Sequence, residues 1–409
     1  MRFLFISRHF PSDLRTSVHG VYKRMGMFIE AIKDFAGLDM LFYVPEDQSY
    51  SQSQISDLEE SFSKHWEADI KLFLCSVSEF NDKTELSKWL SFGAGIINFH
   101  RQKGYFELSG QKQVQALEEC LERKPDAIFA HRLSSMCPLL LTKKILPPIF
   151  FDLDDIEHIV LERYIGQQKK LHSKLLYLLL PELRSGESNA VNLADETYVC
   201  SEKDRSYLMR KFRNSKIVTV PNAVKAPGLQ DARPGQTLLF IGSDYKPNIE
   251  AANFLVESIW PHVHREIPDA KLIIAGIARD KLNRDIAEAE GLEITGFVDD
   301  LDNVYRRSRI VTIPILVGGG TRYKIIEAAS YGKPIVSTAT GAEGIELSHE
   351  TEIIIRDSPE EFAEACIQLL KDSTLCEKIG IKAREKAIRY YDRNNVIRLI
   401  RQHILDCLK

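Results

Sequence analysis

The stretch VGGGTRYKIIEAASYG, residues 317–332, concentrates residue types that could hold a phosphate group. In order, it contains Gly318, Gly319, Gly320, Thr321, Arg322, Lys324 and Glu327. Glycines let the backbone approach a ligand closely, and the free N–H groups of a helix N-terminus bind anions. Arg322 could pair with a phosphate through two hydrogen bonds, whereas Lys324 would act as a point charge. We therefore predict a phosphate site where a helix begins at about Thr321 and ends at Gly332.

Glu327 is the one acid of this stretch and is flanked by isoleucines and alanines. A carboxylate in such surroundings is costly unless it is hydrogen-bonded. Two vicinal hydroxyls, such as those of a ribose, would satisfy it with two charged hydrogen bonds. An alternative stays open: Glu327 could pair with Lys324 or another cation, and the glycines could form a simple turn.

The segments that must position these residues alternate between short apolar runs and amphipathic stretches. Strands are expected at 2–7, 39–44, 70–75, 127–130, 149–152, 196–200 and 217–220, and then at 237–241, 271–275, 293–295, 310–314, 334–337 and 352–355. Such runs, rich in Val, Ile, Leu and Phe without strict alternation, are typical of parallel strands buried on both faces. The predicted fold class is α/β, with two doubly wound Rossmann-like domains facing a cleft. Ligands of such sheets bind outside the carboxyl ends of the strands.

The domain boundaries follow from composition, because 409 residues exceed one typical core. Residues 225–236, KAPGLQDARPGQ, have no periodic apolar pattern and predict a linker. We expect an N-terminal Rossmann-like domain at 1–224 and a second Rossmann-like domain at 237–380. Residues 381–409 predict a C-terminal helix that could pack back on the first domain.

Charge and cysteine content exclude several classes of protein. A net charge of −4 argues against sequence-independent nucleic-acid binding, so no nucleic-acid partner is expected. The seven cysteines are scattered without a CxxC pair, which favours reduced thiols packed as small apolar residues.

No apolar run reaches the length of a membrane span, and the N-terminus fits a first strand better than a signal peptide. A cytoplasmic protein is expected. A dinucleotide-dependent dehydrogenase is disfavoured, since no GxGxxG follows the first strand.

Several stretches resemble the retaining glycosyltransferases of family 4, which have the GT-B fold. They are FIGSDYKPNIEAANFL (240–255), WPHVHREIPDAKLIIAG (260–276) and, most recognisably, residues 296–347, with YVCSEKDRSYL (198–208) and VPNAV (220–224) in matching order. The resemblance implies transfer of a sugar from a nucleotide-diphosphate sugar, with UDP or GDP expected as the nucleotide. It also implies that residues 237–380 form the nucleotide-sugar-binding domain and that residues 1–224 form the acceptor-side domain. The acceptor would be a hydroxyl of a glycan, a lipid-linked or a small molecule, in polysaccharide or glycoconjugate biosynthesis. It implies no further cofactor and no metal.

The resemblance also assigns residues of the second domain. Glu327 matches the ribose-binding second Glu of the family's E-x7-E motif, and the first Glu would fall at Gly319, where it is absent. In the GGGTR-type branch of the family the glycine loop takes that place, so Gly319, Gly320 and Thr321 become the expected diphosphate cradle. Lys246 is the nearest match to the family's cations after the first strand, although an exposed turn lysine is the alternative. The corresponding strand end holds Gly242 and Ser243, and the base-reading segment holds Phe297 and Val298.

In the first domain the family has a glycine loop near the leaving phosphate, which here corresponds to His19, Gly20 and Arg24. A histidine poised at the reacting sugar would fall in FFDLDDIEH, 150–158, where Asp154 or Asp155 stands instead and His158 comes later. His131 is a second candidate, with a structural histidine as the alternative. Together with Lys246 and Arg322, Asp154 and His131 form the expected catalytic set. The acid-rich DLDD could also suggest a metal site, which we disfavour because cations can stabilise a leaving diphosphate instead.

The implied mechanism is retaining: the acceptor hydroxyl attacks on the face that the diphosphate leaves, without a pair of glycosidase carboxylates. Two rival functions are a nucleotide-sugar epimerase on the same scaffold and a non-catalytic nucleotide-binding subunit. The basic stretch KKLHSK, 169–174, precedes LLYLLL. We favour a core helix with a solvated end there; contact with a membrane surface carrying a lipid-linked acceptor, at the cytoplasmic face, is the alternative.

Overall fold

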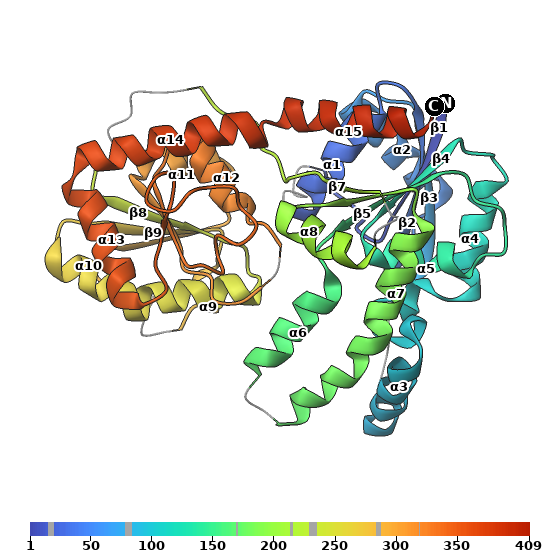
Figure 1. Cartoon of the computed structure of the whole chain (residues 1–409), viewed down its shortest axis with the longest axis horizontal. Helices are drawn as coiled ribbons and strands as arrows, with labels where there is room; N and C mark the ends of the chain where they lie inside the picture. The colour runs from blue at the N-terminus through green and yellow to red at the C-terminus, as the bar shows by residue number, and fades with distance from the viewer. Residues whose placement is uncertain are drawn as a thin grey trace. The chain divides into compact units, whose positions relative to one another are not determined.

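The structure is a computed structural model of the whole chain, and it describes residues 1–14, 20–77, 84–168, 171–212, 216–228, 235–283, 288–318 and 320–409. These residues form two compact units (Figure 1). The first comprises Met1–Pro221 together with Val396–Lys409, and the second comprises Asn222–Asn395. Each unit has its own sheet and its own core.

The first unit is built on a seven-stranded parallel sheet with the order β3-β2-β1-β4-β5-β6-β7. Its strands are β1 (Arg2–Ser7), β2 (Gly37–Pro45), β3 (Ile70–Val77), β4 (Ala127–His131), β5 (Ile149–Asp154), β6 (Glu196–Val199) and β7 (Ile217–Thr219). The central strands are buried along their length, as their apolar runs require. The register pairs Ser7 with His131 and His131 with Asp152, so three polar side chains meet at the carboxyl ends of β1, β4 and β5.

Helices cover this sheet and connect its strands. They are α1 (Gly20–Ile32), α2 (Gln52–Trp66), α3 (Glu85–Ile97), α4 (Gln111–Leu121), α5 (Leu133–Leu141), α6 (Glu157–Gln167), α7 (Leu180–Leu193) and α8 (Glu202–Lys211), with short 3-10 segments η1 (Phe99–Arg101), η2 (Phe106–Leu108) and η3 (Leu171–Leu179). Capping boxes at Ser51 and Thr84 begin α2 and α3. Helices α3, α6 and α7 extend together from the lower side of this unit in Figure 1.

The second unit has a six-stranded parallel sheet with the order β10-β9-β8-β11-β12-β13. Its strands are β8 (Thr237–Ile241), β9 (Lys271–Ala275), β10 (Leu292–Gly296), β11 (Ile310–Ile313), β12 (Ile335–Ser337) and β13 (Ile354–Ile355). Its helices are α9 (Lys246–Phe254), η4 (Leu255–Ile259), α10 (Trp260–Glu266), η5 (Arg279–Lys281), α11 (Leu301–Arg307), α12 (Tyr323–Ser330), α13 (Pro359–Lys371) and α14 (Ser373–Tyr391). The prediction of two doubly wound α/β domains is confirmed.

The last helix, α15 (Arg393–Cys407), continues the chain from the second unit into the first. Within the first unit Arg401 pairs with Asp34, and Nδ1 of His403 lies 3.3 Å from a carboxylate oxygen of Glu196. Of the expected linker, residues 229–234 lie outside the described residues. Pro227 accepts a hydrogen bond of 2.6 Å from Arg384, so this part of the linker is tied to the second unit.

All seven cysteines are free thiols, and six of them are buried, which confirms the prediction of packed, unpaired thiols. In the part of the chain that the structure describes, no helix is both long enough and apolar enough to cross a bilayer.

Candidate functional site

The glycine segment lies between β11 and α12. Gly318 and Gly320 have φ of +133° and +68°, conformations that favour glycine. Gly319, the expected centre of the cradle, lies outside the described residues. An ideal Cβ at Gly318 would lie 2.6 Å from Nη2 of Arg322, so the guanidinium rests against the glycine backbone. The structure therefore brings Arg322 to the segment as expected.

The helix that follows begins later than expected. Arg322, not Thr321, occupies the N-cap position, and α12 starts at Tyr323. The hydroxyl of Thr321 instead accepts a 2.7 Å hydrogen bond from the side-chain amide of Asn222, so it does not cap the helix. The predicted end is confirmed: Gly332 has φ of +67° and donates its N–H to Ala329.

Lys324 joins α12 to the end of β8. Its Nζ donates to Oδ1 of Asn248 at 2.8 Å and lies 4.9 Å from the ring centroid of Phe240. Asn248 in turn donates to the backbone oxygen of Ser243 at 3.2 Å. Burial of the ammonium, together with the charge of Arg322, lowers the pKa of Lys324 to about 7, although the Glu327 carboxylate opposes this. Lys324 is thus a cation whose charge would be stabilised by an anion.

A further residue at this end of the sheet, Gly276, was missed by the sequence analysis, which had named its neighbour Gly242. Gly276 follows β9 with φ of +86°, and a Cβ there would lie 2.2 Å from the carbonyl oxygen of Gly242. A Cβ at Gly242 would lie 2.8 Å from that of Asn248. The end of β9 can approach Gly242 this closely only because position 276 is glycine, and Asn248 of α9 can pack this closely because position 242 is glycine. A glycine directly after the apolar run LIIA was the available signal.

Glu327 lies on the same helix and is partly buried. The phenol of Tyr305, a residue that the sequence analysis also missed, donates to its Oε2 at 3.4 Å. Tyr305 is buried and stacks on Tyr331 with the ring centroids 4.4 Å apart. Tyr305 thus holds one side of the Glu327 carboxylate in place on α12, and the ribose-binding role of Glu327 stays a prediction.

The remaining predicted residues of the second unit are at the surface. Lys246 is the first residue of α9; its side chain is 74% exposed and its Nζ lies 3.6 Å from Glu250. Phe297 is 64% exposed, whereas Val298 packs partly against the core of the unit. No contact recorded for the described residues joins Lys246 to Lys324. Its role in phosphate binding stays a prediction.

In the first unit the prominent feature is a buried arginine. Arg24 on α1 donates to the Asp152 carboxylate through Nε at 3.0 Å and through Nη2 at 2.6 Å, and to the carbonyl oxygen of Val220 at 2.9 Å. Burial, together with the negative charge of Asp154, raises the pKa of Asp152 to about 6 even though Arg24 opposes this. The side chain of Arg24 is almost completely enclosed. This geometry favours a structural role for Arg24, in which it binds Asp152 of β5, rather than the expected contact with a phosphate.

Arg132 and Asp154 adopt unusual backbone conformations at the ends of β4 and β5. Their φ values are +68° and +59°, and such left-handed non-glycine residues cost about 1–3 kcal/mol each. Arg132 binds Asp154 at 2.7 Å and Asp155 at 3.1 Å. Burial would raise the pKa of Asp154, but Arg132 and Arg24 hold it well below its usual range. Asp154 is therefore a carboxylate fixed by two arginines.

Two histidines lie beside this network. His131 is fully buried, with its Nδ1 3.0 Å from the hydroxyl of Ser7. His9 packs edge-on against its ring with the centroids 5.6 Å apart. Burial and the charge of Arg132 lower the pKa of His9 to about 4, and burial lowers that of His131 well below its ordinary value. Both imidazoles are neutral at pH 7. Of the predicted loop residues, Gly20 begins α1, and His19 lies outside the described residues.

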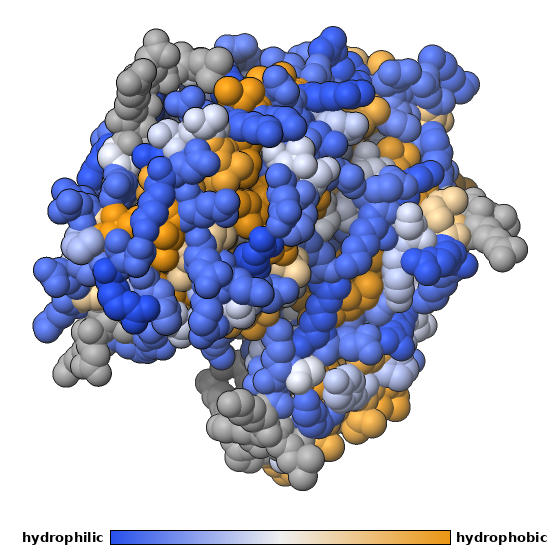
Figure 2. Space-filling view, turned by 60° about the vertical axis from the view of Figure 1, so that its left-hand side comes forward, coloured by the Kyte–Doolittle hydropathy of each residue, from blue (hydrophilic) through white to orange (hydrophobic). Residues whose placement is uncertain are grey.

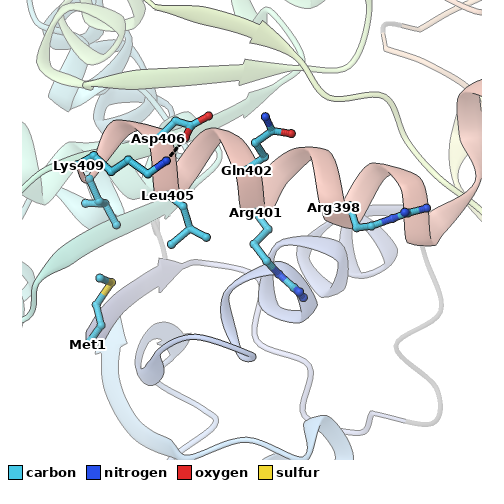
Figure 3. Close-up of a pocket in the computed structure, with 8 residues that line it drawn as sticks. Met1, Arg398, Arg401, Gln402, Leu405, Asp406 and Lys409 are labelled. Carbon is cyan, nitrogen blue, oxygen red and sulfur yellow. Dashed lines mark hydrogen bonds and ion pairs between the residues drawn. The ribbon is translucent and has the colours of Figure 1, made fainter.

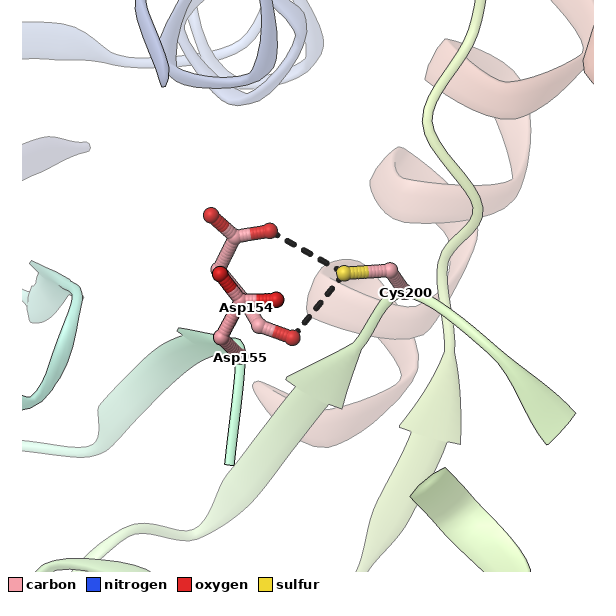
Figure 4. Close-up of side chains that lie close together, drawn as sticks. All are labelled: Asp154, Asp155 and Cys200. Atoms are coloured by element: carbon pink, nitrogen blue, oxygen red, sulfur yellow. Dashed lines mark hydrogen bonds between the residues drawn. The ribbon is translucent and has the colours of Figure 1, made fainter. Parts of the chain in front are cut away.

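Asp154, Asp155 and Cys200 form a cluster whose potential ligand atoms lie within 4.8 Å of one another (Figure 4). The thiol of Cys200 donates to the backbone oxygen and a carboxylate oxygen of Asp154, at 2.9 and 3.0 Å. Burial raises the pKa of this thiol well above its usual value, so it stays protonated. Because arginines already bind both carboxylates, we assign the cluster to the ion-pair network and not to a metal.

A pocket of about 560 Å³ lies elsewhere in the first unit, along α15 (Figure 3). Its lining comes from Met1, Arg398, Arg401, Gln402, Leu405, Asp406, Leu408 and Lys409. None of the predicted site residues lines it.

The comparisons with known proteins concern both parts of the chain. Residues 235–372 match the family model described as glycosyl transferases group 1. A protein described as an uncharacterized 44.6 kDa protein in the cps region of Klebsiella pneumoniae is 27% identical over 168 residues. That match covers 39% of this chain and 43% of the relative's length.

Solved structures resemble almost the whole chain. Alr3699/HepE from Anabaena, in complex with UDP, has a TM-score of 0.66 at 12% identity and covers 99% of this chain and 100% of its own. Sucrose-phosphate synthase from Thermosynechococcus elongatus has a TM-score of 0.68 at 12% identity, with coverages of 99% and 98%. A glycosyltransferase from Rickettsia africae has a TM-score of 0.63 at 14% identity and covers 100% of this chain and 98% of its own. This chain has the two-domain GT-B fold of glycosyltransferases, and its second unit carries the segment similar to group 1.

Proposed function

We propose that the protein is a glycosyltransferase that moves a sugar from a nucleotide-diphosphate sugar to an acceptor hydroxyl. The observation that carries the proposal is the segment after β11, where the glycines and Arg322 lead into α12 and Lys324 and Glu327 follow within its first five residues. A diphosphate there would accept backbone N–H bonds and meet two cations. The group 1 similarity of residues 235–372 and the UDP complex of the Anabaena protein support UDP as the first nucleotide to test.

The proposed chemistry depends on orientation and charge. The cations would stabilise the negative charge that develops on the leaving diphosphate, and Glu327 would fix the ribose. We propose a retaining reaction, in which the acceptor hydroxyl attacks from the side of the leaving phosphate and passes its proton to it. A glycan or lipid-linked acceptor in polysaccharide biosynthesis is expected from the family resemblance, and the relative from a cps region supports this setting.

The test has two stages. Thermal stabilisation by UDP, GDP, ADP and CMP is measured on the wild type and on Glu327→Ala, because a ligand at about 100 times its dissociation constant adds about 2.7 kcal/mol of stability. One nucleoside diphosphate should stabilise the wild type and lose most of its effect in the variant. Sugar release from the matching donor, with and without acceptors, then separates transfer from epimerisation.

A folded protein that no nucleotide stabilises would refute the donor site. Nucleotide binding without any turnover of donor would point to a non-catalytic subunit instead. Removal of a ribose contact should cost about 2–4 kcal/mol of transition-state binding, so an unchanged rate in Glu327→Ala would refute that residue's role.

A further inference from the structure

Asn222 is a buried polar residue at the start of the second unit. Hydrophilic side chains cover most of the face of the molecule in Figure 2, as on most proteins, whereas Asn222 is only 5% exposed. An amide that is removed from water is costly unless it is hydrogen-bonded. The hydrogen-bond partner of Asn222 therefore indicates why a polar side chain lies at this position.

The segment that carries Asn222 is fixed within the second unit. Two residues further on, Val224 donates its N–H to the carbonyl oxygen of Tyr391 at 2.9 Å. The carbonyl oxygen of Val224 accepts the N–H of Arg393 at 3.0 Å, and its side chain belongs to the apolar core of this unit. Because backbone pairing and core packing hold this segment, the amide of Asn222 can act as a donor at a fixed place.

The partner of this donor is the hydroxyl of Thr321, which is 99 positions later in the sequence. Nδ2 of Asn222 lies 2.7 Å from Oγ1 of Thr321. A hydroxyl has one O–H and two acceptor lone pairs, so the amide occupies one lone pair and leaves the O–H to point elsewhere. Within the described parts of the chain, no side chain or carbonyl group accepts that O–H. Thr321 is partly exposed, so a ligand can reach its hydroxyl.

We propose that Asn222 is a positioning residue that orients the Thr321 hydroxyl as a hydrogen-bond donor to the diphosphate of a bound nucleotide. The inference rests on the proposed function, because Thr321 meets a phosphate only if the glycine segment holds the donor. A hydrogen bond to an anionic oxygen is charge-assisted, whereas a lone pair turned towards the same oxygen would repel it. Asn222 acts through Thr321 and does not touch the ligand.

Affinities for a diphosphate and for its nucleoside separate this role from a merely structural one. Calorimetry gives the dissociation constants of the nucleoside diphosphate that stabilises the wild type, of its nucleoside and of inorganic pyrophosphate. Thr321→Val should weaken diphosphate binding at least about tenfold, since a hydrogen bond to a charged group is worth that factor. Asn222→Ala should weaken it at least about threefold, because the released O–H can occupy three staggered orientations. Neither variant should change the affinity for the nucleoside, which has no phosphate.

A double-mutant cycle assigns the effect to the hydroxyl. Asn222→Ala should have no further effect on diphosphate affinity in a Thr321→Val protein, but its effect should persist in a Thr321→Ser protein, which keeps a hydroxyl. Asn222→Asp preserves the shape of the amide and serves if the alanine variant does not fold. Because its carboxylate accepts the O–H, its effect should also shrink in the Thr321→Val protein. Asn283→Ala removes an exposed asparagine that donates to Glu257 at 2.8 Å, and it should bind as the wild type does.

Three results would overturn this inference and leave the donor site intact. They are a diphosphate affinity that the Asn222 variants leave unchanged, equal losses for the diphosphate and the nucleoside, and additive losses in the double variant. The last two would make Asn222 a structural contact of the segment before α12. A folded wild type that binds neither a nucleoside diphosphate nor pyrophosphate would instead refute the proposed function, and this inference with it.

Discussion

Lys324 should make nucleotide binding depend on pH. Its pKa is lowered to about 7 because burial and Arg322 disfavour the ammonium. A bound diphosphate would favour the charged form and raise this pKa again. Binding then takes up protons wherever free Lys324 is neutral and bound Lys324 is charged, which is the range above about pH 7.

The size of the effect follows from the same pKa. With a pKa near 7, about half of the free protein carries the ammonium at pH 7 and about one tenth at pH 8. UDP binding at pH 8 should therefore take up about 0.9 of a proton, and its affinity should fall about fivefold between pH 7 and pH 8. The diphosphate itself contributes little, because a phosphate with a second pKa near 6 is already ionised in this range.

Isothermal titration calorimetry in buffers of different ionisation enthalpy measures the proton uptake directly. Lys324→Arg should bind UDP without uptake, because a guanidinium stays charged. Lys246→Met, which removes an exposed lysine, should keep the full uptake. Tight UDP binding that neither takes up protons nor weakens at pH 8 would refute the placement of Lys324 at the diphosphate.

Three further predictions concern stability. Arg24→Met should lower the free energy of unfolding by about 3–5 kcal/mol, because it leaves the Asp152 carboxylate buried without its cation. Denaturant unfolding measures this loss, and a variant as stable as the wild type would contradict it. Gly276→Ala should cost at least about 1–3 kcal/mol and weaken UDP binding, since its Cβ would strike the carbonyl of Gly242; unchanged melting and binding would argue against this packing. His9 has a folded pKa of about 4, below its unfolded value, so its contribution is present above pH 6.5 and lost as the pH falls through 6.5 towards 4. His9→Gln should therefore reduce the loss of stability in that window, and an unchanged slope would refute the burial of a neutral imidazole.

The strands were predictable because parallel strands buried on both faces leave continuous apolar runs in the sequence. Each of the 13 strands in the described residues was expected, and the differences lie at their ends. Strand β5, for example, continues past Asp152 to Asp154 through an irregularity in its pairing with β6. That extension depends on Arg24 and Arg132, which bind Asp154. The apolar pattern of β5 does not reveal these partners, because they lie elsewhere in the sequence.

The site was predictable only where neighbouring residues compose it. The glycine segment and Glu327 lie within ten residues and carry a readable pattern. The environment of Lys324 depends on Asn248, which is 76 positions away, and that of Arg24 on Asp152, which is 128 positions away. Arg24 illustrates the limit: a cation on a helix after a glycine predicts a ligand contact, and only the tertiary structure shows that a buried aspartate occupies it.

The division of the chain has a consequence for biosynthesis. Residues 396–409 belong to the first unit but are translated after the whole of the second. During synthesis the first unit therefore lacks the pairing of Arg401 with Asp34 and the contact of His403 with Glu196 until the whole of residues 222–395 has been translated. The first unit thus depends on a segment of 14 residues that carries none of the predicted site residues and is made only after the second unit.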